Sequence, residues 1–371
     1  MIRFLLFLLV LPFLFSCHQA KKEDTETKVP AQIKYATGFS IDYADSYTLV
    51  TVKNPWDTTK VLHRYVLIDR GTELSDGLPE GDVVPIPINS IACLSSADAS
   101  MIERLGDLNK IKAIAETRYV KMPLLRKGLD EGNIADIGDH ASLNIERLME
   151  TSPDIIIVAP YQNMGYGKLE TTGINIVECA SYLENTPLGR AEWIRFLAAF
   201  LKKDKEAETI MEEIANEYLS LKEKAGNLSP RPTVFSEKLY GSAWYIPGGK
   251  SYMAHFFEDA GADYLWKDDE HTGSLTLNLE MVYDQAENAD YWIIKSDKEL
   301  TYSLLKSENA SYSWFKAWKD RKVIYSNTVL NNYYEEGVMN PHWVLNDLIR
   351  IFHSEIALTT DSIRYFDLLK E

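Results

Sequence analysis

The residues best suited to bind a small molecule are aromatic side chains near the ends of apolar runs, together with one arginine and one histidine. Aromatic faces suit a broad, planar or apolar ligand, and the Arg118 guanidinium could bind a carboxylate or catecholate oxygen. Core packing is the alternative for each single ring, because aromatic side chains also dominate protein cores. As a group at predicted strand ends, they indicate a ligand site. The predicted contacts are Arg118, Tyr119, His140, Tyr161, Tyr182, Tyr240, Trp244, Tyr245, Tyr252 and Trp266, with His271 as a further candidate.

His140, in the run Gly138-Asp139-His140, could ligate the iron of haem, the cobalt of a corrin or a bare metal ion. A hydrogen-bonded loop histidine is the alternative, because no second histidine follows at the i+4 spacing of a helical ligand pair. The other histidines form no evident ligand set, and the chain has no Cys-x-x-Cys. We therefore predict no metal site built from side chains alone and no resident cofactor.

No motif predicts catalysis. The chain lacks Gly-x-Ser-x-Gly, His-Glu-x-x-His and a phosphate-binding loop. The adjacent carboxylates of Asp268-Asp269-Glu270 are expected to be solvated on a loop. We expect a binding protein and not an enzyme.

The chain begins like an exported protein. Arg3 is followed by an almost wholly apolar run to Phe15, and Ser16-Cys17 comes next. This run is shorter than the roughly 20 residues of a membrane-spanning helix, so it predicts a signal peptide, residues 1–16. The place of Cys17 resembles a lipobox, which predicts a lipid-modified first residue, with cleavage elsewhere as the alternative. The charged segment 17–32 then reads as a flexible tether.

Size and charge narrow the function further. With 371 residues the chain exceeds what one hydrophobic core usually organises, so two lobes are expected. The net charge of −16, without a basic stripe, speaks against nucleic acid as a partner. Cys93 and Cys179 remain after processing, either as one disulfide or as two buried thiols.

The order of predicted elements is that of a two-lobed α/β protein. Residues 33–69 alternate like a small antiparallel β appendage, within an N-terminal lobe of residues 33–186. Strands and helices alternate from residue 88 to 177, and again within a C-terminal lobe of residues 229–371, which predicts mostly parallel central sheets. Residues 187–228 read as a long connecting helix that either breaks near Lys203-Asp204 or forms a strut. A ligand cleft is expected between the lobes.

A short internal repeat supports two similar lobes. Leu143-Asn144-Ile145-Glu146 precedes the apolar run that starts at Asp154, and Leu277-Asn278-Leu279-Glu280 precedes the one that starts at Asp290. Each copy predicts a helix capped by Asn that leads into a buried strand.

From about residue 85 to the end, the chain resembles the class III (helical-backbone) substrate-binding proteins of bacterial ABC importers. The resemblance rests on the lipobox, on Ile102-Glu103-Arg104-Leu105-Gly106, on Ser152-Pro153-Asp154-Ile155-Ile156, and on Gly248-Gly249-Lys250-Ser251 leading to Phe257-Glu258-Asp259-Ala260-Gly261. It implies capture of a ferric siderophore, haem or cobalamin and delivery to a membrane permease.

The resemblance also implies that Glu103 and Glu258, one on each lobe, dock into basic pockets of the permease, although most surface glutamates are simply solvated. We expect a monomer, tethered by lipid alone, on a periplasm-facing membrane surface of a Gram-negative bacterium. The alternatives are a Zn or Mn carrier of a related importer and a surface lipoprotein that passes ligand to an outer-membrane receptor.

Overall fold

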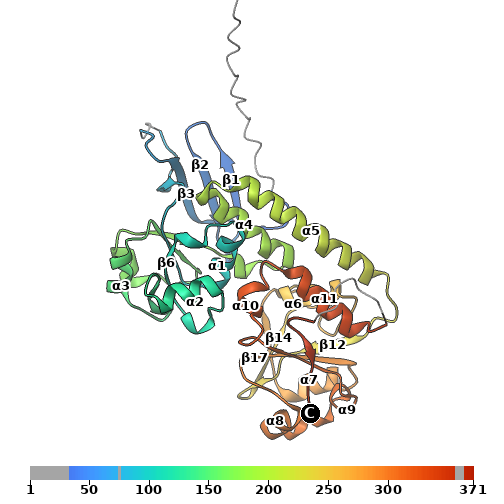
Figure 1. The fold of residues 1–371 in the computed structure, drawn as a ribbon. Coiled ribbons are helices and arrows are strands. Elements are labelled where there is room, and N and C mark those ends of the chain that lie inside the picture. Colours follow the sequence, from blue (N-terminus) through green and yellow to red (C-terminus); the bar gives the residue numbers. More distant parts are fainter. Residues whose placement is uncertain (1–32, 74–76, 356–362) are drawn as a thin grey trace, which may run out of the picture.

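Two parallel sheets, one in each lobe, form the framework of the molecule (Figure 1). The computed structural model describes residues 33–73, 77–355 and 363–371, so the predicted signal peptide, the tether and Cys17 lie outside the described residues. The strand orders are β11-β10-β5-β6-β7 in the N-terminal lobe and β15-β12-β17-β18-β19 in the C-terminal lobe. Only the edge pair β18 and β19 is antiparallel among these neighbours. The predicted two-lobed α/β fold is confirmed.

The strands of the N-terminal sheet are β5 (Ile91–Cys93), β6 (Ile111–Ile114), β7 (Ala135–Asp136), β10 (Ile155–Val158) and β11 (Asn175–Glu178). Those of the C-terminal sheet are β12 (Thr233–Ser236), β15 (Asp263–Tyr264), β17 (Tyr291–Ser296), β18 (Val323–Asn327) and β19 (Asp367–Leu368). Smaller sheets contain β8 (Gly138–Asp139) with β9 (Ser142–Leu143), and β13 (Leu239–Tyr240) with β14 (Ala243–Pro247) and β16 (Ser274–Leu277).

The helices of the N-terminal lobe are α1 (Ser96–Arg104), α2 (Pro123–Asp130) and α3 (Ile145–Thr151). Those of the C-terminal lobe are α6 (Tyr252–Asp259), α7 (Leu279–Ala286), α8 (Tyr302–Glu308), α9 (Lys316–Lys319), α10 (Tyr333–Glu336) and α11 (Pro341–Phe352). The segment near residues 164 to 172 is a 3-10 helix, Gly167–Thr171. None of the helices within the described ranges has the length and apolar character needed to cross a bilayer.

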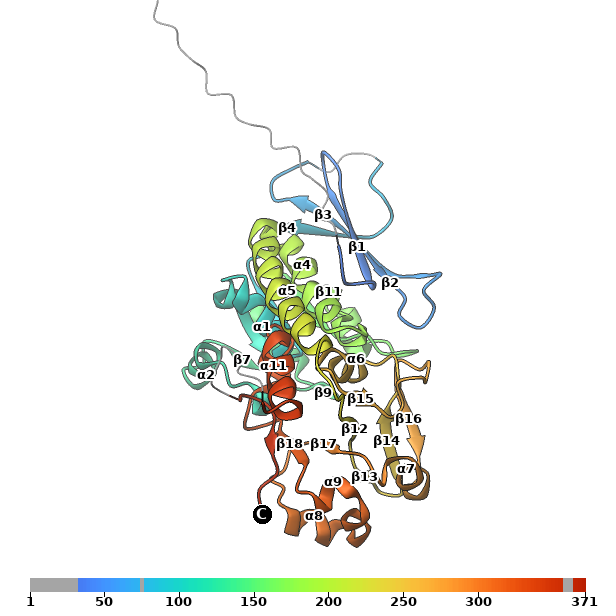
Figure 2. The same cartoon turned by 90° about the vertical axis from the view of Figure 1, so that its right-hand side faces the viewer.

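The connecting segment is two helices, α4 (Pro187–Leu201) and α5 (Asp204–Gly226), which lie side by side (Figure 2). Lys202 adopts a left-handed conformation with φ 57° and ends α4, so the predicted break near Lys203-Asp204 is confirmed and the single strut is wrong. Nearly every residue of α4 is buried. A helix that is apolar all round belongs in a core, and α4 therefore forms part of the core.

The front segment is larger than predicted. Its sheet contains β1 (Phe39–Tyr43), β2 (Thr48–Lys53) and β3 (Val61–Asp69), which are antiparallel, and also β4 (Asp82–Ile86), which pairs parallel to β3. We call these four strands the front sheet. The prediction ended the segment at residue 69. A parallel pair of strands is joined by a longer connection than a hairpin, so the sequence between β3 and β4 carries no turn signal that predicts their pairing.

The front sheet covers α4 on the side away from the C-terminal lobe (Figures 1 and 2). The ring of Phe39 lies 4.8 Å from that of Trp193, and the ring of Tyr65 lies 5.4 Å from that of Phe200. The buried Glu192 carboxylate accepts backbone N–H groups of residues 34–36 at 2.6–3.1 Å. The front sheet is therefore part of the N-terminal lobe's core and not a loose appendage.

The repeat has a structural counterpart in each lobe. Asn144 and Asn278 cap α3 and α7, since each side chain accepts a backbone N–H from the first turn, which confirms the predicted caps. Ahead of the next strand, the Asp154 N–H donates to the Ser90 hydroxyl at 2.9 Å, and the Asp290 N–H donates to the Thr233 hydroxyl at 2.9 Å. Both aspartates thus tie two neighbouring parallel strands together at their amino ends.

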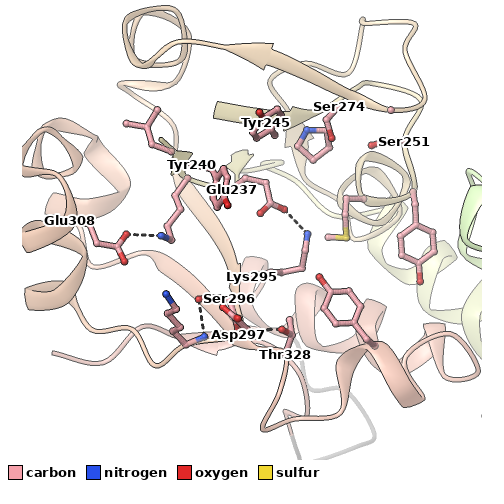
Figure 3. A pocket seen from close by; sticks show the side chains of 18 of the residues that line it. Glu237, Tyr240, Tyr245, Ser251, Ser274, Lys295, Ser296, Asp297, Glu308 and Thr328 are labelled. Atoms are coloured by element: carbon pink, nitrogen blue, oxygen red, sulfur yellow. Dashed lines mark hydrogen bonds and ion pairs between the residues drawn. The ribbon is translucent and has the colours of Figure 1, made fainter. Parts of the chain in front are cut away.

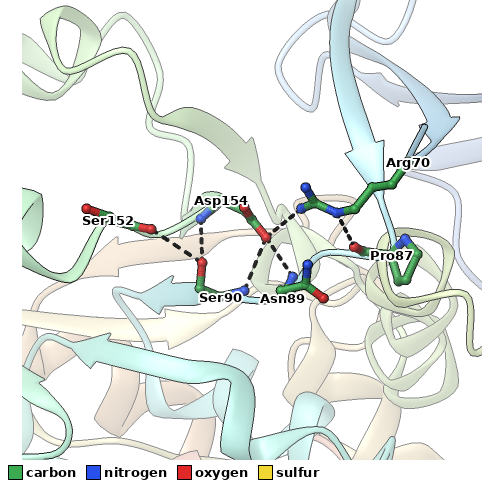
Figure 4. Close-up of polar contacts among 6 residues, drawn as sticks. All are labelled: Arg70, Pro87, Asn89, Ser90, Ser152 and Asp154. Atoms are coloured by element: carbon green, nitrogen blue, oxygen red, sulfur yellow. Dashed lines mark hydrogen bonds and ion pairs between the residues drawn. The ribbon is translucent and has the colours of Figure 1, made fainter. Parts of the chain in front are cut away.

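In the N-terminal lobe, Asp154 also interacts with a residue that follows the front-sheet strand β3 (Figure 4). The Asp154 carboxylate accepts the backbone N–H groups of Asn89 and Ser90 and pairs with Arg70 at 2.7 Å. Arg70 follows β3 directly and donates through Nε to the Pro87 carbonyl. One carboxylate therefore joins β3, β5 and β10.

Candidate ligand-binding site

A cavity of about 560 Å³ lies between the lobes. In the N-terminal lobe its walls come from segments that follow β5, β6 and β11, and from the start of α4. In the C-terminal lobe they come from α6, from the ends of β17 and β18, and from α10. Ligands of open α/β sheets bind beyond the carboxyl ends of the strands. Here the carboxyl ends of two such sheets face one cavity, which makes it the candidate site.

A second cavity of about 730 Å³ opens within the C-terminal lobe, between the sheet β13-β14-β16 and the end of β17 (Figure 3). The two cavities share six lining residues, so they meet. These shared residues are Tyr252, Met253, Lys295, Asp297, Thr328 and Tyr334. Each cavity has a volume within the range of roughly 300–1,000 Å³ that is usual for small-molecule sites.

Five of the predicted contacts line this space. Tyr119 and Tyr182 line the cavity between the lobes, Tyr240 and Tyr245 line the C-terminal one, and Tyr252 lines both. Tyr240 is 80% exposed, so its ring is open to a ligand. The structure thus brings these rings together from both lobes.

Three predicted contacts are neighbours of the described lining residues and do not line either cavity themselves. The His140 ring lies edge-on to Tyr161 with centroids 5.2 Å apart, and Tyr161 lies 6.0 Å from Tyr182, which does line the cavity. The Arg118 guanidinium pairs with Glu116 at 3.0 Å and lies over the Tyr119 ring. Among the described residues that line either cavity, His140, Tyr161 and Arg118 are absent.

Two predicted contacts are wrong. Trp244 is fully buried, donates its indole N–H to the Ser236 carbonyl at 2.9 Å and packs against Trp292. Trp266 is also buried and packs beside Tyr264. Successive side chains of a strand point to opposite faces, so Trp244 and Tyr245 of β14 cannot both face the ligand. His271 is an exposed loop residue beside Asp269 and is absent from the described lining of both cavities.

Two positively charged residues that line the cavities were not among the predicted contacts. Arg190 lies in the first turn of α4 and lines the cavity between the lobes. Lys295 lies on β17, lines both cavities and pairs with Glu237 at 2.6 Å (Figure 3). Arg190 was hidden in a segment interpreted as a connector, while Lys295 directly follows the apolar run that defines β17. A polar residue just beyond a buried parallel strand was the available signal.

The predicted docking residues occupy matching positions. Glu103 lies in the last turn of α1 and Glu258 in the last turn of α6, and both are exposed. The carbonyl of each accepts the N–H of the glycine three residues on, Gly106 or Gly261. Partial burial is the larger cause that raises the pKa of Glu103, and the neighbouring negative charge of Glu336 is the second.

The cysteine question left open by the sequence is answered. Cys93 and Cys179 are both buried free thiols. Cys93 ends β5 and Cys179 directly follows β11, and these two strands flank β10 on opposite sides, so a strand lies between the two cysteines. Burial raises the pKa of both thiols well above the usual value. Over the ranges that the structure covers, no group of three or more His, Cys, Asp or Glu side chains is arranged to hold a metal ion.

Two lobes with facing sheets, a helix at their junction and an aromatic cavity between them are the features of a class III solute-binding protein. Residues 91–328 match the periplasmic binding protein family, and the chain belongs to that family.

Relatives and solved structures agree with this assignment. An uncharacterized lipoprotein of the archaeon Methanocaldococcus jannaschii is 29% identical over 360 residues, which cover 89% of this chain and 84% of the relative. A periplasmic heme-binding protein from Pseudomonas aeruginosa has the same fold, with a TM-score of 0.60 at 15% identity over 76% of this chain and 99% of that one. A protein of an Fe3+-hydroxamate transport system from Saccharomonospora viridis has a TM-score of 0.56 at 16% identity. The match covers 72% of this chain and 94% of that one.

Proposed function

We propose that this protein is the substrate-binding lipoprotein of an ABC import system, and that it captures an iron complex, either a ferric siderophore or haem, or else cobalamin. The observation that carries the proposal is the cavity between the lobes, lined by Tyr119, Tyr182 and Tyr252 from opposite sides. Aromatic walls suit large, partly planar complexes. Two proteins of the same fold, a heme-binding protein and a protein of an Fe3+-hydroxamate transport system, support the same class of cargo.

Anchoring by lipid at Cys17 belongs to the same proposal. It is supported by the apolar run that ends at Ser16-Cys17 and by the archaeal relative, which is named a lipoprotein. The named relative is archaeal, so the expectation of a Gram-negative host gains no support from it. The proposal requires only a membrane that also carries the permease.

Delivery to the permease is proposed to use Glu103 and Glu258. Both are exposed carboxylates at equivalent helix ends on the two lobes. Charge-assisted bonds to arginines of the permease would let it sense the relative position of the lobes.

The test is titration of the chain lacking residues 1–17 with cyanocobalamin, haemin and a panel of ferric siderophores, followed by tryptophan fluorescence and calorimetry. We expect saturable, submicromolar binding of one class. The substitution Tyr252→Ala should weaken binding at least tenfold, while the matched control Tyr47→Ala, in the turn between β1 and β2, should not. Absence of binding across the whole panel would overturn the proposal.

A further inference from the structure

Arg190 is a half-buried cation whose partners carry no negative charge. Its Nη2 donates to the carbonyls of Tyr182 at 2.6 Å and Glu184 at 3.3 Å. Its guanidinium lies 3.7 Å from the centre of the Tyr252 ring, and its Nε is buried without a hydrogen-bond partner.

The nearest obvious acid is already committed elsewhere. The Glu184 carboxylate accepts the N–H groups of Thr37 and Gly38 and the indole N–H of Trp193. No carboxylate of the described residues lies within ion-pair distance of Arg190. An unpaired, partly desolvated cation costs free energy, and it is unexpected in a chain with a net charge of −16.

Lys295 supplies a second positive charge to the same place. Its side chain is only 13% exposed, and it lies where the two cavities meet. Burial by itself would lower the pKa of Lys295, but the charge of Glu237, its hydrogen bond and the neighbouring Tyr334 and Tyr252 together outweigh burial, so the net pKa is raised and the ammonium group stays charged. Arg190 and Lys295 both act electrostatically on Tyr252, which lines both cavities and marks the space between them.

Glu237 balances only one of these two charges. Its carboxylate pairs with Lys295 at 2.6 Å, and its backbone carbonyl accepts the Trp292 indole N–H, which fixes its position. Lys295 and Glu237 together carry no net charge, so the charge of Arg190 remains without a compensating carboxylate among the described residues.

We propose that Arg190 and Lys295 form a subsite for an anionic oxygen group of the ligand, a carboxylate or a catecholate, and that the cargo is therefore an anionic metal complex rather than a neutral one. This inference rests on the proposed function. A guanidinium presents paired N–H donors that match carboxylate geometry. The ammonium group of Lys295 adds a point charge where the two cavities meet. The anionic group of the ligand would thus balance the charge of Arg190, for which the described residues provide no carboxylate.

The test uses matched probes on the chain lacking residues 1–17. The anionic arms are haemin, ferric citrate and a ferric tris(catecholate), and the neutral arms are a ferric trihydroxamate and cyanocobalamin. Calorimetry compares the wild type with Arg190→Gln and Lys295→Gln. The matched controls are Arg126→Gln and Lys306→Gln, which replace exposed cations on α2 and α8. Thermal unfolding of each variant reports whether it folds.

We expect an anionic probe to bind the wild type, and both cleft variants to lose at least tenfold in affinity, equivalent to 1.4 kcal/mol, with the controls unchanged. Arg190→Lys should recover part of the loss. The probe that binds distinguishes a carboxylate source from a catecholate source.

Two results overturn the inference and leave the proposed function standing. One is tight binding of a neutral probe only, and the other is binding of an anionic probe that folded Arg190→Gln and Lys295→Gln variants leave unchanged. Failure of the wild type to bind any probe would instead overturn the proposed function, and the inference with it.

Discussion

The Glu335 carboxylate accepts the backbone N–H of Lys121 at 3.0 Å and so joins the two lobes directly. The N–H of Met122 lies 3.4 Å from the same oxygen. Glu335 belongs to α10, whose residues Tyr333 and Tyr334 line the cavity, and its side chain is only 2% exposed. The contact therefore links the wall of the ligand cavity to the relative position of the lobes.

Replacing Glu335→Gln should weaken ligand binding by about tenfold. The amide still accepts a hydrogen bond, but a bond to a charged acceptor is worth roughly 1.5–3 kcal/mol against about 1 for a neutral one. Calorimetric titration with the cargo measures the loss. The control is Glu336→Gln on the same helix, which should bind within about twofold of the wild type. Equal affinity of Glu335→Gln and the wild type would show that this contact does not contribute to the ligand-binding arrangement of the lobes.

The sequence was sufficient for features encoded locally. Asn144 and Asn278 each sit before an acidic first turn and an apolar run, which is enough to predict a cap, a helix and the strand beyond it. The lobes and their order follow from the alternation of such units. The matching helix ends at Glu103 and Glu258 also lie in short recognisable runs.

Features that depend on distant contacts were missed. Arg190 becomes a site residue only because α4 runs along the junction of the lobes and its first turn meets Tyr252 of α6. The parallel pairing of β4 with β3 has no local signature. One of Trp244 and Tyr245, in contrast, could have been excluded, since a strand cannot present both side chains to the same face.

Stability should fall as pH rises through the titration of Asp98. This side chain is buried in the first turn of α1, and burial, opposed by a hydrogen bond with Cys179, raises its pKa from 3.8 to about 7. The folded state then binds the proton more tightly than the unfolded state does. Its stabilising effect is complete below about pH 4 and is lost between about pH 4 and 7, by up to roughly 4 kcal/mol.

Asp98→Asn should therefore be more stable than the wild type at pH 8 and similar to it at pH 4. Urea unfolding at both pH values, followed by circular dichroism, measures the difference. The control is Asp130→Asn on the exposed end of α2, which should leave the pH dependence unchanged. A wild type and Asp98→Asn with parallel pH profiles would contradict a raised pKa.

The two strand ties should contribute to stability by similar amounts. Asp154→Ala leaves the N–H groups of Asn89 and Ser90 and the Arg70 guanidinium without this acceptor, and Asp290→Ala does the same to Thr233 and Lys316. Each should lower the free energy of unfolding by about 1–3 kcal/mol. Because the ties lie in different lobes, their effects should add in the double variant. Chemical denaturation of all three variants is the measurement, and a loss below 0.5 kcal/mol for either single variant would contradict the tie as an energetic element.

Charge reversal of Glu103 and Glu258, the proposed docking residues, should abolish delivery without affecting ligand binding. Glu103→Arg and Glu258→Arg replace exposed carboxylates at the ends of α1 and α6, and like charges facing basic pockets of a permease cost several kcal/mol. Binding to the permease in lipid nanodiscs and uptake of labelled cargo are the readouts. Glu150→Arg, an equally exposed change on α3, is the matched control. Unchanged uptake and permease binding in the double variant would remove Glu103 and Glu258 from the interface.

Ligand binding should move the lobes only slightly. The core helix α4 packs against α1 in the N-terminal lobe and against α6 and α11 in the C-terminal lobe, so a large hinge rotation would break buried contacts on both sides at once. Glu335 adds a direct bond between the lobes, and α5 packs against both α4 and α11. Small-angle scattering should therefore show a change in radius of gyration below about 1 Å between the free and the loaded protein. A substantially larger change in radius of gyration would contradict this prediction. If hydrogen exchange showed that α4 stays folded, the lobes would have to rotate about the ends of α4.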